Sequence, residues 1–222
     1  MLATLASIAT LTTVTPRLGA VRVAIECSFG GVMNRKERQS LAHQLRRAYG
    51  ANRRAANPLE LHVTALADVR ATECLQPYEL EPMTRWDVHR AEQPAHQLWP
   101  AHEHVWLSPD AEEPLLALEP DVTYVVGGLV DRSVISRATA DRAEAAGARC
   151  VRLPLREFAP RPDVHPILSV HSVVAILASV HSGVSWEAAL ADELPQRYIK
   201  RREFEEERRR ADARTADSMP EY

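Results

Sequence analysis

The chain has 222 residues, of which 45% are apolar, enough to bury the core of one sizeable domain. No apolar run approaches about 18 to 20 residues, the length a bilayer span needs, so we expect no membrane-spanning segment. The three cysteines and the histidines between residues 96 and 104 lack metal-ligand spacing, so we predict no metal site and a reducing compartment.

The net charge of −3 conceals an uneven distribution along the chain. Residues 34–54 hold seven basic residues and one acid, a balance of +6, and residues 195–210 hold seven bases and four acids, a balance of +3. Residues 60–121 hold thirteen acids and three arginines, a balance of −10. Two basic segments around an acidic one indicate contact with a polyanion; ordinary solvated helix faces are the alternative.

The N-terminal part of the chain predicts a strand and a capped helix. Residues 1–20 contain one arginine and no acid, and we expect a flexible terminus; a weak targeting segment is the alternative. Residues 21–29 alternate in polarity and predict the first strand. Asn34 and Glu37 have capping-box spacing, so a helix begins there, and Gly50 is expected to end it.

The middle of the chain predicts further strands with short connections. Alternation predicts a strand over residues 59–64, and short apolar runs predict buried strands over residues 104–108 and 122–126. Residues 68–104 indicate a loop-rich insertion, because prolines and histidines interrupt every periodic pattern. Residues 112–118 predict one short helix.

The stretch from Tyr124 to Asp131 joins a buried strand to two glycines and an acid. Gly127 and Gly128 at the strand exit indicate a tight turn or a close approach of another segment. In α/β proteins ligands collect at the carboxyl ends of strands, so Asp131 would be placed for proton transfer. A solvated turn residue is the alternative.

The C-terminal part continues the alternation of helix and strand, which predicts a parallel sheet. Thr139 is expected to cap a helix ending before Gly147, and residues 149–153 predict a strand. Helical spacing of valines and leucines begins at Ser169, and another helix runs from Ser185 to the residue before Pro195.

Seven segments together resemble one family. They are Ile25–Phe29, Ser40–Tyr49 with Asn52 and Arg53, Tyr124–Asp131, Arg152–Phe158, Leu168–Val170, Trp186–Ala189 and Leu194–Arg197. In order and spacing, over about residues 21–202, they resemble the tRNA N1-methyltransferases that modify the purine at position 9. This family is a branch of the SPOUT (trefoil-knotted) methyltransferase superfamily.

The resemblance implies a fold and a cofactor. The fold would be α/β, a mostly parallel sheet flanked by helices with a C-terminal trefoil knot, over residues 21–200, followed by a charged tail over 201–222. The cofactor would be S-adenosylmethionine (SAM), held mostly by backbone groups and apolar side chains. Matched by motif, the cofactor-binding residues would be Leu107, Ser108, Gly128, Arg132, Ser133, Thr139, Leu153, Leu168 and Val170. Ordinary core packing is the alternative for the leucines and the valine.

The resemblance also assigns the chemistry to Asp131. Guanine N1 carries a proton and is a poor nucleophile until that proton leaves, so a carboxylate within hydrogen-bond reach would act as general base. With adenine as the substrate, N1 carries no proton at the start, and Asp131 would act during or after transfer. We expect guanine.

The substrate implied by the resemblance is tRNA, contacted by the two basic segments. Matched by motif, the RNA-binding residues would be Gln44, Arg47, Asn52, Arg53, Arg197, Lys200, Arg201 and Arg202. For Gln44 an ordinary surface amide is the alternative. We further expect a monomer in the nucleus or cytoplasm, with the mitochondrion as an alternative.

Two departures from the family pattern motivate a rival hypothesis. The chain has Leu107–Ala111 as Leu-Ser-Pro-Asp-Ala where the family commonly has Leu-Thr-Ala-Asp-Ser, and Ser169-Val-His171 where it has Thr-Val-Asn. The rival is a catalytically silent RNA-binding or scaffold subunit of a tRNA-processing assembly. A Rossmann-type dinucleotide enzyme is a weaker alternative, because no phosphate-binding glycine loop is present.

Overall fold

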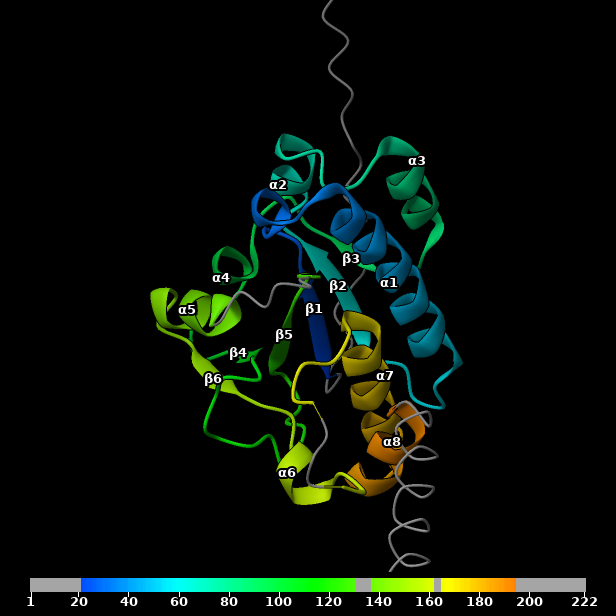
Figure 1. The fold of residues 1–222 in the computed structure, drawn as a ribbon, viewed down its shortest axis with the longest axis vertical. Coiled ribbons are helices and arrows are strands. Elements are labelled where there is room, and N and C mark those ends of the chain that lie inside the picture. Colours follow the sequence, from blue (N-terminus) through cyan, green and yellow to red (C-terminus); the bar gives the residue numbers. More distant parts are fainter. Residues whose placement is uncertain (1–20, 131–136, 162–164, 195–222) are drawn as a thin grey trace, which may run out of the picture.

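A computed structural model describes residues 21–130, 137–161 and 165–194. They form a six-stranded sheet in the order β3-β2-β1-β5-β4-β6, with every neighbouring pair parallel (Figure 1). The strands are β1 (Arg22–Glu26), β2 (Glu60–Thr64), β3 (His89–Arg90), β4 (His104–Leu107), β5 (Thr123–Gly127) and β6 (Arg149–Val151). The predicted parallel sheet is therefore confirmed.

The centre of the sheet is buried on both faces. Val23 and Val125 are 0% exposed and Ile25 is 1% exposed. Strands covered on both faces read as continuous apolar runs, and this is why Val23, Ala24 and Ile25 follow one another in β1 and Tyr124, Val125 and Val126 in β5. Their register places Ile25 beside Val126 and Glu26 beside Gly127, so both strands end at the same edge.

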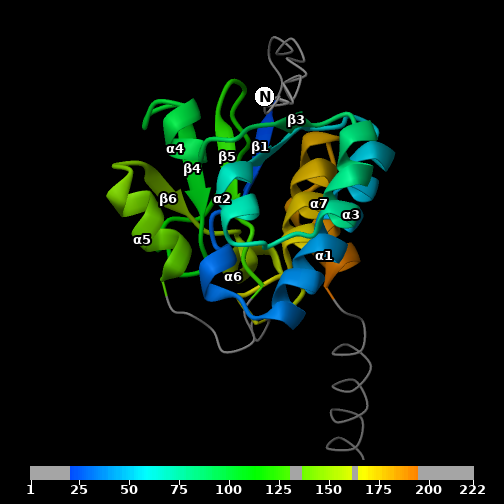
Figure 2. The same cartoon turned by 90° about the horizontal axis from the view of Figure 1, so that it is seen from above.

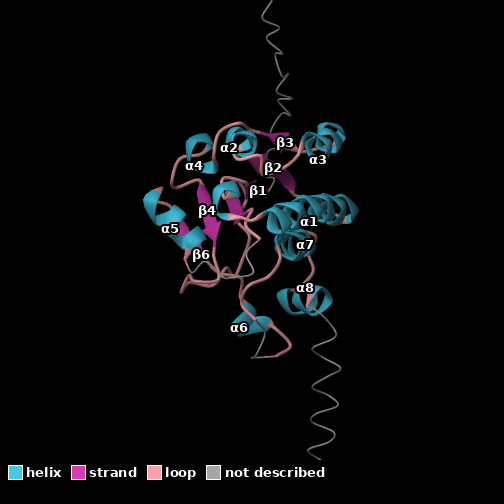
Figure 3. Cartoon of the chain, turned by 45° about the horizontal axis from the view of Figure 1, so that its top comes forward, coloured by secondary structure: helices cyan, strands magenta, loops and turns pink. Residues whose placement is uncertain are grey.

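Helices cover both sides of the sheet. They are η1 (Gly30–Val32), α1 (Arg35–Arg54), α2 (Leu66–Ala71), α3 (Pro77–Leu80), η2 (Glu81–Arg85), α4 (Ala95–Leu98), α5 (Ala138–Ala145), α6 (Leu155–Phe158), α7 (Val170–His181) and α8 (Trp186–Glu193). Figure 2 shows α1 and α7 on one side of the sheet and α5 on the other. In Figure 3, α1, α7 and α8 lie in a row, because α7 packs against both of the others.

The start of α1 is the capping box that its sequence predicts. The Asn34 side chain accepts hydrogen bonds from the amides of Lys36 and Glu37, and the Glu37 carboxylate accepts one from the Asn34 amide. The predicted end at Gly50 is wrong, since the helix continues to Arg54. Two further helix starts are confirmed: the hydroxyls of Ser169 and Ser185 cap α7 and α8.

The helix predicted over residues 112–118 is also wrong. The Leu115 amide donates to the Arg152 carbonyl, and the Arg152 amide donates to the Glu113 carbonyl, each at 2.8 Å. This segment therefore runs beside the chain that follows β6. Thr139 is not a helix cap either, because α5 begins after Arg137, whose φ is 62°.

Within the described residues no helix is long and apolar enough to cross a membrane. The predicted C-terminal knot, the flexible terminus over residues 1–20 and the charged tail over 201–222 stay predictions, and both termini lie outside the described residues.

Candidate cofactor cavity and nucleic-acid interface

A cavity of about 240 Å³ lies at the edge of the sheet where β4, β5 and β6 end. Four segments far apart in the sequence build its wall: the chain after β4, the chain after β5 with the start of α5, the chain after β6 with α6, and the approach to α7. The lining residues are Leu107, Ser108, Pro109, Asp110, Val126, Gly127, Leu129, Ala138, Thr139, Arg152, Leu153, Leu155, Arg156, Pro166, Ile167, Leu168, Val170 and Val173.

The structure brings together most of the residues matched to cofactor binding. Six of the nine line this cavity: Leu107, Ser108, Thr139, Leu153, Leu168 and Val170. Gly128 is not among the lining residues. Arg132, Ser133 and the predicted base Asp131 lie outside the described residues, although Leu129, two positions before Asp131, lines the cavity.

Both glycines of the central stretch permit close approaches, as their sequence predicts. A Cβ on Gly127 would lie 2.8 Å from Oγ1 of Thr139 across the cavity wall. A Cβ on Gly128 would lie 2.7 Å from the carbonyl oxygen of Glu26. Neither glycine is among the residues with positive φ, so the requirement is space and not a left-handed backbone.

Charged groups at the cavity were missed by the sequence reasoning. Asp110 accepts a hydrogen bond of 3.0 Å from the amide of Arg137. Arg152 donates two hydrogen bonds, of 2.8 and 2.7 Å, to the carboxylate of Glu157. These bonds lower the pKa of Glu157. Asp110 belongs to the segment Leu107–Ala111, which departs from the family pattern. Its place in that segment could have indicated that it lies at the cavity.

The approach to α7 places two lining residues, Leu168 and Val170, beside the second departing motif. The His171 Nδ1 lies 2.8 Å from Oγ of Ser169. Burial, followed by the charge of Arg47, lowers the pKa of His171.

The predicted RNA-binding residues on α1 separate into two kinds. Arg47 and Arg53 are exposed. Asn52 is 5% exposed, and its side chain exchanges two hydrogen bonds of 2.9 Å with the backbone of Leu59. Asn52 therefore lies beyond the predicted helix end at Gly50 but still within the last turn of α1, and its side chain ties that turn to the start of β2. This side chain does not face solvent, where a phosphate would be bound.

Gln44 is partly buried and bonded within the protein. Its carbonyl oxygen accepts a 2.8 Å hydrogen bond from the amide of Val170, and its amide donates to Oγ of Ser40 at 3.3 Å. Arg197, Lys200, Arg201 and Arg202 lie outside the described residues.

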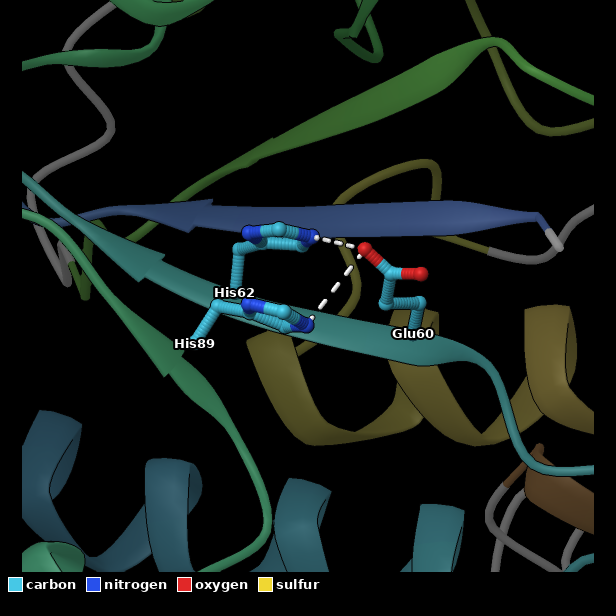
Figure 4. A group of neighbouring side chains, drawn as sticks. All are labelled: Glu60, His62 and His89. Carbon is cyan, nitrogen blue, oxygen red and sulfur yellow. Dashed lines mark hydrogen bonds and ion pairs between the residues drawn. The ribbon is translucent and has the colours of Figure 1, made fainter. Parts of the chain in front are cut away.

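A cluster of Glu60, His62 and His89 lies away from this cavity, where β2 begins (Figure 4). Nε2 of His62 and Nε2 of His89 lie 3.0 and 3.4 Å from Oε1 of Glu60. The two rings are stacked, with centroids 4.2 Å apart and planes within 14°. The three side chains could hold a metal ion, and both imidazole nitrogens also lie within ion-pair distance of one carboxylate oxygen. The prediction of no metal site stays a prediction.

A parallel sheet with a mixed polar and apolar cavity at the carboxyl ends of its strands defines the class: an α/β protein with a cavity at the edge where proteins of this class bind ligands. The family model described as tRNA (guanine(9)-N(1))-methyltransferase TRM10/TRM10A matches residues 9–199. The chain belongs to this family, which confirms the resemblance and, with the observed sheet, the SPOUT fold class.

Individual relatives agree with this assignment. The chain is 28% identical to tRNA methyltransferase 10 homolog B of Danio rerio, over 81% of this chain and 59% of that protein. It is 28% identical to the tRNA (guanine(9)-N1)-methyltransferase of Schizosaccharomyces pombe, over 80% of this chain and 59% of that protein. It thus spans a little over half the length of these relatives.

Among solved structures, the full-length spTrm10–SAH complex has a TM-score of 0.71 and 26% identity to this chain. The match covers 80% of this chain and 97% of that one. The dual specific Trm10 of Thermococcus kodakaraensis has a TM-score of 0.60 at 22% identity, which supports the fold alone.

Proposed function

We propose that the protein is a SAM-dependent methyltransferase acting on N1 of the guanine at position 9 of tRNA. The observation that carries the proposal is the convergence of six motif-matched residues from four distant segments on one cavity. Membership of the TRM10 family and the names of the relatives support the substrate, and the complex of spTrm10 with SAH supports the cofactor.

The residues that line the cavity suit SAM in their chemistry. Leu107, Leu153 and Leu168 supply apolar wall for an adenosine, and hydroxyls of Ser108 and Thr139 supply polar contacts. The missing side chain at Gly127 leaves room that a Cβ would take. The Asp110 carboxylate attracts positive charge and the Arg156 guanidinium attracts negative charge, and SAM carries both. Bound SAM supplies an electrophilic methyl group on a sulfonium.

Asp131 would remove the N1 proton of guanine as N1 attacks the methyl group. Its position in the chain supports this role, because Leu129 lines the cavity just before it. General-base help contributes roughly 10²–10⁴-fold to a rate. Alignment of N1 with the methyl group contributes further, since it converts a bimolecular step into an effectively unimolecular one.

The exposed Arg47 and Arg53 on α1 would bind tRNA phosphates. We propose the same role for Arg197, Lys200, Arg201 and Arg202. Position 9 lies within the folded tRNA, so exposing its base would cost a few kcal/mol. Phosphate contacts release counterions, so we expect affinity to fall steeply with salt.

Labelled SAM and unmodified tRNA, with mass spectrometry of the product nucleosides, test the proposal. We expect 1-methylguanosine at position 9, and a loss of roughly 10²–10⁴-fold in Asp131→Asn. Asp141→Asn, an exposed carboxylate on α5, is the matched control and should retain the activity. Binding of tRNA without methyl transfer by the unaltered protein would favour the rival scaffold function.

A further inference from the structure

The first turn of α7 has two different caps. Val170 is the first residue of the helix, and like every residue there its amide has no acceptor within the helix. The Ser169 hydroxyl accepts from the amide of Ser172 and leaves the Val170 amide to another group. That group is Gln44, from the middle of α1, at 2.8 Å.

This hydrogen bond joins α1, which carries the first of the two predicted tRNA-binding segments, to the cofactor cavity. Leu168 and Val170, on either side of Ser169, both line the cavity, and Val170 is only 3% exposed. Gln44 is held in turn by its own amide, which donates to Ser40 one turn earlier. The carboxamide thus has a fixed orientation, with the oxygen directed at α7.

We propose that Gln44 is a positioning residue for SAM binding: its carbonyl oxygen fixes the segment Leu168–Val170 in the shape that completes the cavity. The inference rests on the proposed function and deepens it. It assigns Gln44 to the cofactor side of the site, whereas its motif match assigns it to RNA. Arg47 lies three positions further along the same helix, on the same face, so adjacent side chains of α1 would serve the two substrates.

The two assignments predict opposite results for conservative variants. Gln44→Met keeps the length of the side chain and removes the acceptor. Gln44→Glu keeps an oxygen acceptor and adds a negative charge, which a phosphate would repel. A positioning role therefore makes the Met variant defective toward SAM and the Glu variant nearly normal. If Gln44 contacts a phosphate instead, Gln44→Glu should bind tRNA more weakly than Gln44→Met does.

Isothermal titration with SAM, without tRNA, is the direct measurement. We expect the Kd for SAM to rise about tenfold in Gln44→Met, the loss typical of one hydrogen bond to a buried amide. Gln44→Glu should stay within about twofold of the unaltered protein. Gln39→Met is the matched control, because Gln39 is an exposed amide on the same helix. In turnover, the Met variant should raise KM for SAM more than KM for tRNA.

Two results would overturn the inference. If Gln44→Met binds SAM as tightly as the unaltered protein does, the inference about Gln44 is wrong and the proposed function stands. Absence of SAM binding by the unaltered protein would overturn the proposed function and the inference with it. If the Met variant does not fold, hydrogen exchange on the unaltered protein decides: the Val170 amide should be protected without SAM, and exchange at the rate of an open amide would contradict the cap.

Discussion

The amide of Gly128 donates a 2.7 Å hydrogen bond to the carbonyl oxygen of Glu26, at the point where β1 and β5 end side by side. The same oxygen would lie 2.7 Å from any Cβ at position 128. The bond therefore requires a glycine, and it directs the chain from the end of β5 to Leu129 in the cavity wall.

Gly128→Ala should destabilise the protein. The added methyl group meets backbone, which cannot move aside like the end of a side chain, so we expect unfolding to become easier by about 1–3 kcal/mol. Urea denaturation measures this change. Gly31→Ala is the control, because a Cβ there would meet nothing within 4 Å. Equal stability of Gly128→Ala and Gly31→Ala would contradict this prediction, because it would show that the ends of β1 and β5 can move apart without loss of stability.

Asn52→Ala should act on stability and Arg53→Ala on RNA binding. Removing the Asn52 side chain leaves the amide and carbonyl of Leu59, which is 4% exposed, without their partners, at a cost of about 1–3 kcal/mol. Arg53 is exposed, so its loss should leave thermal unfolding unchanged and lower the salt dependence of tRNA affinity by about one unit of slope. If Asn52→Ala weakened tRNA binding without destabilising the fold, and Arg53→Ala destabilised the fold, both assignments would be wrong.

The histidine cluster predicts a loss of stability in mild acid. Burial, followed by the charge of His89, lowers the pKa of His62 from 6.5 to about 4. Glu60 acts in the opposite direction and raises this pKa, whereas the charge of Arg22 lowers it. Below pH 6.5 the unfolded chain therefore binds a proton at His62 that the folded protein rejects. The contribution to stability is complete above pH 6.5 and declines by up to about 1.4 kcal/mol per unit as the pH falls toward 4.

Denaturation with urea at pH 7.5, 5.5 and 4.5 measures this decline. His62→Gln removes the titrating group, so its unfolding free energy should depend less on pH than that of the unaltered protein. His102→Gln, whose side chain is 81% exposed, is the matched control and should follow the unaltered protein. Parallel pH profiles for all three proteins would contradict the role of His62.

Local signals predicted the parts of the fold that depend on neighbours in sequence. The capping box at Asn34, the serine caps of α7 and α8 and the apolar strands each carry their cause within a few residues. Gly127 and Gly128 likewise indicate close approaches from the sequence alone, and the structure shows Thr139 and Glu26 as the neighbours.

The errors arose where a distant partner decides the structure. Residues 112–118 have no helix because Arg152 pairs with their backbone. The last turn of α1 persists beyond Gly50, and Asn52 in that turn bonds to Leu59. The acceptor role of Gln44 depends on Val170, 126 residues away, and no local pattern reports it.

The two border strands of the sheet are its shortest: β3 has two residues and β6 has three. Such borders present few backbone groups to which a strand of another molecule can add. A parallel sheet of this kind assembles from segments far apart in the chain, which makes its folding slow and exposes it to aggregation. The short edge strands therefore leave few unpaired backbone groups through which two copies of the sheet could join edge to edge.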